Sequence, residues 1–188
     1  MSLYSRQALT TKRMTLTDIT EDDFVATYAM DQDPLVLRYL GDGKAEMRPF
    51  SEYRDYMRDV LAFWTCEQYR LWTMRLHGSD AFLGWAMLKP IKDADFKYTP
   101  HVEVGYRLPQ SSWGRGYATE ATLAVLAYGF NTVGLDEITA VTHPDNAASQ
   151  HVLTKCGLQR DGTLNYNGRG EIPFFRISKQ DFLNSHGN

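Results

Sequence analysis

Residues 112–121 read Ser-Trp-Gly-Arg-Gly-Tyr-Ala-Thr-Glu-Ala, and this segment constrains the fold more than any other part of the chain. It follows an alternating run, residues 102–108, that is typical of a strand, and it opens a long apolar stretch typical of a helix. Gly114 and Gly116 therefore fall where a strand passes into a helix, and glycine permits a tight turn there. Unpaired N–H groups at a helix N-terminus suit a phosphate or pyrophosphate group. The competing interpretation is a turn whose glycines serve geometry alone.

Two common phosphate-binding loops do not fit this segment. A dinucleotide-binding fingerprint needs a third glycine, and Thr119 stands in that place. It also needs an acidic residue after the next strand, whereas Asp136 and Glu137 precede the strand predicted at 138–142. A Walker loop needs Gly-Lys-Ser/Thr, which the chain lacks.

Length and charge restrict the remaining possibilities. The 188 residues predict one domain (1–188, with a core of about 10–182) that is large enough to bury a substantial core. A net charge of −3 gives no electrostatic reason to expect nucleic acid or an anionic membrane as a partner. No apolar run reaches the roughly 18 residues of a membrane span, and the first residues lack the apolar stretch of a signal peptide. We therefore expect no membrane association.

The metal-binding residue types do not cluster. The five histidines show no metal-ligand spacing with one another or with a cysteine, so we expect no metal. Cys66 and Cys156 lie far apart and form no disulfide framework, which fits a reducing cytosol and predicts a cytoplasmic protein.

Periodicity predicts the order β-α-α-α-β-β-β-α-β-α-β-β, which is an α+β domain. The predicted strands are 12–17, 71–76, 82–88, 102–108, 137–142, 158–161 and 172–178. The predicted helices are 22–30, 34–40, 52–67, 117–130 and 147–156. Ser51 is expected to cap the third helix and Gly157 to end the last one. Residues 91–100 are polar and indicate a loop.

Three polar side chains near the glycine turn are candidates for chemistry. Glu103 is out of phase with the apolar residues of its strand and faces the other side, where Gly105 is expected to leave a gap beside the carboxylate. A solvated strand carboxylate is the simpler alternative. Asn146 precedes a helix and is most simply its N-cap. Ser149 lies on the inward stripe of that helix, where its hydroxyl needs a partner, although it could bond its own backbone.

Together these segments resemble the GNAT superfamily of N-acetyltransferases, in particular its RimJ/RimL-like branch. The resemblance covers nearly the whole chain. The segments that match the family most specifically are Val-Glu-Val-Gly-Tyr-Arg-Leu at 102–108, Trp-Gly-Arg-Gly-Tyr-Ala-Thr-Glu-Ala at 113–121, and Asn146-x-x-Ser149 followed by Lys-Cys-Gly at 155–157. It implies a central mixed, mostly antiparallel twisted sheet of six to seven strands flanked by helices, splayed between the strands at 102–108 and 137–142.

The resemblance also implies acetyl-CoA as co-substrate. Backbone amides of the turn would hold the pyrophosphate, main-chain groups of the preceding strand would pair with pantetheine, and Asn146 matches a family asparagine near the CoA arm. The cofactor-binding residues implied in this way are Tyr106, Arg107, Leu108, Trp113, Gly114, Arg115, Gly116, Tyr117, Ala118, Thr119 and Asn146. Trp113 stands where many members carry Gln or Arg, but the contacts there come largely from the backbone and Trp is common in this branch.

For catalysis the resemblance implies Glu103 as general base, since a protonated amine cannot attack. A backbone N–H on the splayed strand would stabilise the oxyanion. The tyrosine acid of many members is replaced here by Leu153, so Ser149 is the expected proton donor to the leaving thiolate. Cys156 is expected to be a core thiol rather than a nucleophile. We therefore expect the acetyl group to pass directly from acetyl-CoA to the acceptor in a ternary complex, without an acyl-enzyme.

The acceptor is expected to be a primary amine of a peptide, protein or small molecule, which the sequence does not specify. Its pocket is expected between the helices at 22–40 and 52–67 and the loops at 91–100 and 162–171. A non-catalytic acyl-CoA sensor or partner-binding module is the alternative function. A monomer and a homodimer are equally compatible with the sequence, although the strand at 172–178 is a candidate exposed edge.

Overall fold

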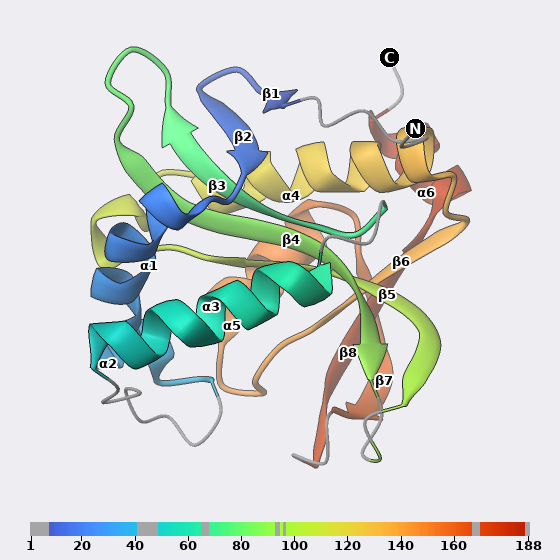
Figure 1. Cartoon of the computed structure of the whole chain (residues 1–188). Helices are drawn as coiled ribbons and strands as arrows, with labels where there is room; N and C mark the ends of the chain where they lie inside the picture. The colour runs from blue at the N-terminus through green and yellow to red at the C-terminus, as the bar shows by residue number, and fades with distance from the viewer. Residues whose placement is uncertain are drawn as a thin grey trace.

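The protein is seen in a computed structural model that describes residues 8–40, 49–64, 68–92, 95, 97–166 and 170–186. Its centre is an eight-stranded sheet in the order β1-β2-β3-β4-β5-β6-β8-β7, with helices on both faces (Figure 1). The strands are β1 (Leu9–Thr10), β2 (Met14–Asp18), β3 (Arg70–Leu76), β4 (Phe82–Lys92), β5 (Tyr98–Arg107), β6 (Glu137–Val141), β7 (Gln159–Asn165) and β8 (Glu171–Ser178). The α-helices are α1 (Phe24–Asp31), α2 (Pro34–Leu37), α3 (Phe50–Trp64), α4 (Tyr117–Tyr128), α5 (Ala147–Lys155) and α6 (Lys179–His186).

Short turns of other helix types adjoin these elements. One turn, η1 (Glu21–Asp23), leads into α1, and another, η2 (Gln110–Ser112), precedes the glycine turn. A π-type turn, η3 (Gly129–Val133), continues α4. The predicted α+β class is confirmed, and the predicted elements follow one another in the predicted order, with β1 added before them and α6 after them.

Among the described strands the sheet has one parallel pair, and that pair is short. Within the described residues β5 and β6 are matched at a single position, Glu103 opposite Thr139, while the other neighbouring strands pair antiparallel over longer stretches. The Thr139 hydroxyl donates to the Val102 carbonyl at 2.9 Å and holds the strands together there. Beyond this point β5 and β6 diverge. The expected splay is therefore present, in a sheet whose eight strands exceed the upper end of the expected six to seven by one.

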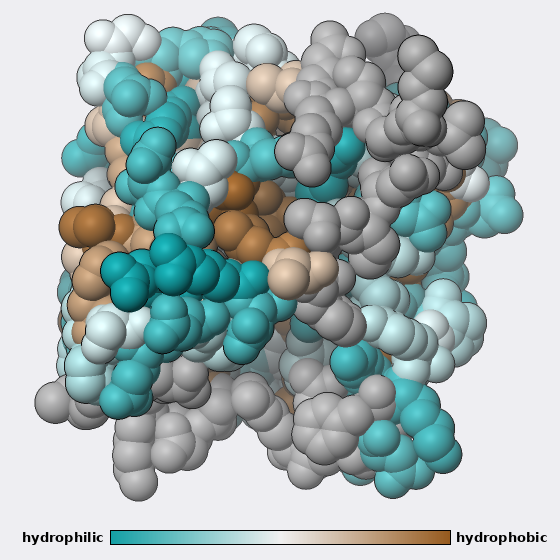
Figure 2. Space-filling model, in the orientation of Figure 1, coloured by the Kyte–Doolittle hydropathy of each residue, from teal (hydrophilic) through white to brown (hydrophobic). Residues whose placement is uncertain are grey.

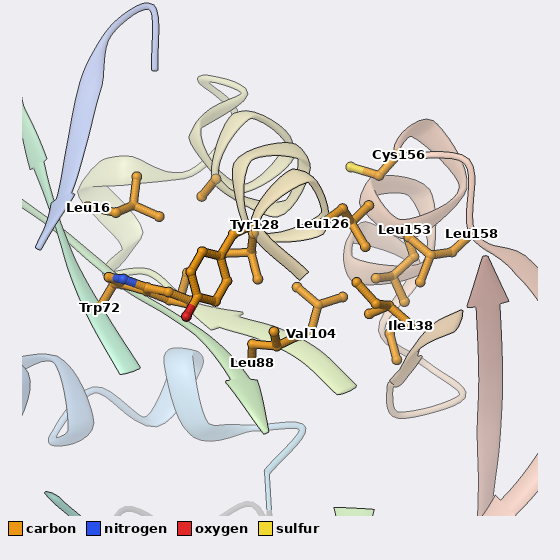
Figure 3. Close-up of a cluster of buried hydrophobic side chains, with 14 of the residues drawn as sticks. Leu16, Trp72, Leu88, Val104, Leu126, Tyr128, Ile138, Leu153, Cys156 and Leu158 are labelled. Carbon is orange, nitrogen blue, oxygen red and sulfur yellow. The ribbon is translucent and has the colours of Figure 1, made fainter. Parts of the chain in front are cut away.

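The two faces of the sheet bury separate apolar clusters. The larger cluster joins α4, α5 and α6 to the sheet and includes Trp72, Leu126 and Ile138. Figure 3 shows the Trp72 ring beside that of Tyr128, and the two rings meet edge to face with centroids 5.2 Å apart. The smaller cluster lies under α1 and α3 on the opposite face and is made of Ile19, Phe24, Tyr53, Met57 and Leu71. Leu71 and Trp72 are neighbours in β3 and point to opposite faces, as the period of a strand requires.

Helix α3 is amphipathic, as its spacing predicted. Tyr53 and Met57 are buried against the sheet, and Val60 and Leu61 pack beside them. Figure 2 shows the outer side of this helix as a hydrophilic band across the face of the molecule. The apolar stripe is thus core, as expected of its spacing.

Several boundaries differ from the prediction. Residues 91–100 are not a loop as a whole, because β4 extends to Lys92 and β5 begins at Tyr98, with Lys92 paired to Tyr98 across the hairpin. Cross-strand hydrogen bonds form this extension, and a polar sequence does not reveal them. Ser51 lies within α3 rather than at its cap, because the helix begins at Phe50. The last residues of the predicted helix 52–67, including Cys66, lie outside the described residues.

The C-terminal part also differs in detail. The strand predicted at 172–178 is not an exposed edge: β8 lies between β6 and β7, and the polar β7 forms the edge. The predicted strand at 158–161 is the start of the longer β7, and α6 and β1 were not predicted. Gly157, with φ of +90°, ends α5 as expected.

Candidate active site

Within the part of the chain that the structure describes, the glycine turn has a group of backbone amides without a protein partner. Gly116 is the N-cap of α4 in the left-handed conformation (φ +78°, ψ 7°), and no side chain caps the helix. Among the described residues, no acceptor pairs with the N–H groups of residues 114–119, whereas the Trp113 N–H bonds the Gln110 carbonyl. A Cβ at Gly114 would meet nothing within 4 Å. This open turn, with its unpaired donors at the positive end of a helix, has the chemistry of an anion site.

Arg13 and Glu120 form an ion pair that holds the glycine turn in place. The Arg13 Nε donates to Glu120 Oε2 at 2.7 Å, and its Nη1 donates to the Arg115 carbonyl at 2.8 Å. Thr11 Oγ1 donates to Glu120 Oε1 at 2.6 Å. The Arg13 guanidinium also lies 4.6 Å from the centre of the Tyr117 ring. This ion pair was not predicted from the sequence, because Arg13 and Glu120 are 107 residues apart.

Trp113 has a structural contact of its own. Its indole Nε1 donates to the Leu108 carbonyl at 2.8 Å, which ties the turn back to the end of β5. The Leu108 carbonyl is therefore already paired within the protein, and the ring itself is 40% exposed. The other two residues whose main chain is expected to pair with pantetheine, Tyr106 and Arg107, lie beyond the single position at which β5 and β6 are paired.

Glu103 is buried rather than solvated. It is 2% exposed, and its Oε1 lies 2.8 Å from the Lys89 Nζ and accepts from the Tyr166 hydroxyl at 2.7 Å. Lys89 stands directly opposite Glu103 on β4. The gap expected at Gly105 is filled, since a Cβ there would meet the Met87 side chain. Lys89 and Tyr166 were not found from the sequence; the paired hairpin of β4 and β5 is the signal that would have located Lys89.

Ser149 is held from two directions. Its backbone N–H donates to Asn146 Oδ1 at 3.1 Å, which confirms Asn146 as the N-cap of α5. Its hydroxyl lies 3.2 Å from the Tyr106 hydroxyl on β5, so the serine bonds a neighbouring strand through its side chain. Burial raises the pKa of the Tyr106 phenol to about 12, so this group is neutral near pH 7.

Glu103 and Tyr106 are three residues apart on β5 and point to opposite faces of the strand. The carboxylate and the Tyr106–Ser149 pair therefore reach the point of divergence from opposite faces. Arg107 points to the same face as Glu103, where its Nη1 bonds Asp31 Oδ1 at 2.7 Å and its guanidinium lies 4.9 Å from the centre of the Trp85 ring. Its side chain is thus directed toward α1.

Cys156 has the character of a core thiol. It is fully buried, its Sγ contacts the Thr119 carbonyl at 3.6 Å, and Figure 3 shows it at the end of α5 beside the cluster. Burial raises the pKa of the thiol to about 12, which suppresses the reactive thiolate. In the described ranges, no three His, Cys, Asp or Glu residues are grouped so that they could hold a metal ion. No helix in this part of the chain combines the length and apolar character needed to cross a bilayer.

The fold and the sequence both match known proteins. The acetyltransferase (GNAT) domain family matches residues 13–159. An uncharacterized N-acetyltransferase of Bacillus subtilis, YoaA, is 28% identical over 156 residues, which cover 83% of this chain and 85% of that protein. RimL, a ribosomal L7/L12 alpha-N-protein acetyltransferase solved with coenzyme A, superposes with a TM-score of 0.75 at 13% identity, covering 92% of this chain and 98% of RimL. AAC(6′)-Ib, solved with ribostamycin and coenzyme A, has the same TM-score at 18% identity, covering 92% of this chain and 97% of AAC(6′)-Ib.

The diverging sheet and these matches define the class of acetyl-CoA-dependent acyltransferases. Because the domain match spans well over half of the chain, the protein belongs to the GNAT acetyltransferase family, and its fold is similar to that of RimL. It is an N-acetyltransferase whose co-substrate is acetyl-CoA.

Proposed function

We propose that this enzyme transfers acetyl directly from acetyl-CoA to a primary amine, in a ternary complex and without an acyl-enzyme. The observation that carries the proposal is the set of unpaired amides at 114–119 beside the point where β5 and β6 diverge. A pyrophosphate at the turn would place the rest of an extended CoA arm along β5, because the turn directly follows that strand. The only cysteine in the described residues, Cys156, is buried and poorly nucleophilic, which supports transfer without a covalent intermediate.

The residues from Trp113 to Thr119 would hold the pyrophosphate, with backbone amides as donors and no Cβ at Gly114 or Gly116 to obstruct it. The main chain of Tyr106, Arg107 and Leu108 would pair with pantetheine. Because the Trp113 indole already uses the Leu108 carbonyl, the remaining groups of that stretch would carry the pairing. The Asn146 side chain caps α5 through its oxygen and would offer its NH₂ group to the CoA arm.

Glu103 would accept the proton that the acceptor ammonium must lose before it attacks. A main-chain N–H of β5 would stabilise the tetrahedral oxyanion. Ser149 would protonate the departing thiolate as the C–S bond breaks, and its hydroxyl is fixed for this by Tyr106. The nitrogen would release its second N–H proton to solvent at this stage, and the serine would recover a proton from solvent. Acetyl-CoA supplies the thioester that these groups act on.

The acceptor would enter on the face that carries α1 and α3, where Glu103 points. RimL is named for a protein substrate, and AAC(6′)-Ib was crystallised with the small molecule ribostamycin. Both kinds of amine therefore belong in the test. We propose a cytoplasmic enzyme with its activity in one domain, on the basis of its cysteine usage and its continuous sheet.

The test is thiol release from acetyl-CoA with a panel of amines: a serine-starting tetrapeptide, free lysine, spermidine and ribostamycin. We expect turnover with at least one amine and acetyl-CoA binding by calorimetry. Tight acetyl-CoA binding without turnover on any amine, unchanged by Glu103→Gln, would instead indicate an acyl-CoA sensor. The absence of any acetyl-CoA binding would remove the proposed cofactor site.

A further inference from the structure

Three side chains around Glu103 form a closed triangle of hydrogen bonds. The Tyr166 hydroxyl donates to Glu103 Oε1 at 2.7 Å, Lys89 Nζ lies 2.8 Å from the same oxygen, and Lys89 Nζ donates to the Tyr166 oxygen at 3.1 Å. The members come from different parts of the sheet: Lys89 lies in β4, Glu103 lies in β5, and Tyr166 directly follows the end of β7. Two donors thus converge on a single carboxylate oxygen.

The triangle has a defined distribution of charge. Burial alone would lower the pKa of Lys89, but the facing Glu103 carboxylate outweighs that effect and raises it, so Lys89 stays an ammonium. The pKa of the Tyr166 phenol is raised to about 12, mainly by burial and then by the Glu103 charge, so the phenol keeps its proton. Near pH 7 the triangle is therefore an ion pair with a neutral phenol between its members.

The three members differ in their access to solvent. Glu103 is 2% exposed and the Lys89 side chain 20% exposed, whereas Tyr166 is half-buried at the end of the solvent-exposed edge strand β7. A phenol oxygen has two lone pairs and one proton. Within the described residues, Lys89 donates to one of these lone pairs and the Tyr166 hydroxyl donates its proton to Glu103, so the second lone pair of Tyr166 is open to an incoming donor.

We propose that Tyr166 is a catalytic residue that relays the proton of the acceptor amine to Glu103, a step that rests on the proposed role of Glu103 as base. The ammonium of the acceptor gives a proton to the Tyr166 oxygen as the Tyr166 hydroxyl proton passes to Glu103 Oε1. The N–H bond of the acceptor and the O–H bond of Tyr166 break, and one O–H bond forms on each of Tyr166 and Glu103. The freed nitrogen lone pair attacks the thioester carbonyl. Lys89 remains charged throughout and is a positioning residue that holds both oxygens.

The relay accepts only an amine that still carries a proton to give away. A primary ammonium donates to the Tyr166 oxygen, whereas an acceptor that is already a free amine has no proton to lose before it attacks and needs no relay for that step. The requirement for Tyr166 therefore depends on pH relative to the pKa of the acceptor, which is about 8 for an α-amine and about 10.4 for a lysine side chain. A residue that merely packs the hairpin would not produce this dependence.

The experiment measures kcat/KM from pH 6.5 to about 11, above the pKa of about 10.4 of a lysine-type amine, for the wild type and Tyr166→Phe, with the panel amine that the wild type turns over fastest and a no-enzyme blank at each pH. We expect Tyr166→Phe to lose about 100-fold at pH 7, in the range for proton-transfer catalysis. The loss should shrink to within about threefold once the pH exceeds the pKa of the acceptor, where free amine is abundant. Tyr128→Phe is the matched control, because it removes a phenol that also accepts from a cation, Arg70, away from the point of divergence.

A second set of variants tests whether Tyr166 acts through Glu103. Glu103→Gln alone removes the carboxylate that faces the partly buried Lys89 ammonium and risks unfolding the protein. The double variant Lys89→Met/Glu103→Gln removes both charges together, and thermal melting confirms its fold. Adding Tyr166→Phe to this background should lower kcat/KM by less than about twofold. The reason is that Tyr166 and Glu103 act in the same proton transfer, so the effects of their substitutions do not add.

The outcomes separate this relay from the proposed function. An active wild type whose Tyr166→Phe variant keeps its rate at pH 7, or loses the same factor at every pH, overturns the relay and leaves the acetyltransferase assignment intact. Multiplicative losses in the charge-free background overturn it as well. A wild type without turnover on any panel amine overturns the proposed function and the relay together.

Discussion

The phenol oxygen of Tyr106 lies 3.2 Å from the hydroxyl oxygen of Ser149, which joins the diverging strand β5 to the first turn of α5. The same serine donates its backbone N–H to Asn146, so both its main chain and its side chain are fixed. A hydroxyl held in this way retains one rotamer, and its orientation depends on Tyr106. The pair therefore links the proposed proton donor to the strand along which CoA is proposed to lie.

Ser149→Ala should lower kcat by about 10-fold with little change in the KM for acetyl-CoA. This is less than the 10²–10⁴-fold typical of proton transfer, because a thiolate with a pKa near 8.5 leaves without full protonation. Tyr106→Phe should lower kcat by about threefold in the wild type and have no further effect in Ser149→Ala, since the two groups act as one unit. Steady-state kinetics of the four proteins measures this. Additive losses would show that Tyr106 acts independently of Ser149.

Gly116→Asp should weaken acetyl-CoA binding at least about tenfold, or about 1.4 kcal/mol, because it places a carboxylate beside the proposed pyrophosphate site. Calorimetry measures the affinity. Gly134→Asp is the control: Gly134 has a similar φ of +81° and open space around it, so it carries the same backbone strain away from the turn. Equal affinities for Gly116→Asp and the wild type would show that the pyrophosphate does not bind at this turn.

Glu120→Gln should destabilise the protein at pH 7 by about 1–2 kcal/mol, through the loss of charged hydrogen bonds to a partly exposed arginine. Burial would raise the pKa of Glu120, but hydrogen bonds from Thr11 and Arg13 lower it below its ordinary value of 4.5. A carboxyl whose folded pKa is lowered stabilises the protein above the unfolded pKa, and this stabilisation fades as the pH falls. The difference between wild type and variant should therefore be largest at pH 7 and shrink below pH 4.5, as measured by urea unfolding. A difference that grows toward acid pH would contradict the assignment.

Cys156 should resist modification in the folded protein, because burial raises the pKa of its thiol to about 12. In a Cys66→Ser background, a disulfide reagent at pH 8 should label the thiol only after denaturation. Cys156→Ala should keep kcat within about threefold, as expected of a core residue outside the chemistry. An acetylated Cys156 trapped by mass spectrometry with acetyl-CoA alone would contradict direct transfer.

The sequence predicted those parts of the protein that local interactions decide. The glycine turn, the Asn146 cap and the Gly157 terminus each depend on the conformation of one or two residues, and all three are where the pattern indicated. The alternation of residues 102–108 correctly placed Glu103 opposite its apolar neighbours. These features need only neighbours along the chain.

Predictions that depended on pairing were less accurate. The continuation of β4 and β5 through Lys92 and Tyr98 is formed by cross-strand hydrogen bonds, so polar residues there indicated a loop. The position of β8 inside the sheet follows from its pairing with both β6 and β7. The sequence of a strand does not show whether the strand lies at the edge or in the interior of a sheet.

The tertiary structure alone decided the surroundings of the proposed catalytic groups. Lys89 faces Glu103 through strand register, Tyr166 reaches it from 63 residues away, and Arg13 meets Glu120 across 107 residues. The sequence supplied the carboxylate and the turn, but burial and register determined which charges they meet. Electrostatic interactions act through space, and their strength depends on separation and solvent exposure, which the order of residues along the chain does not fix.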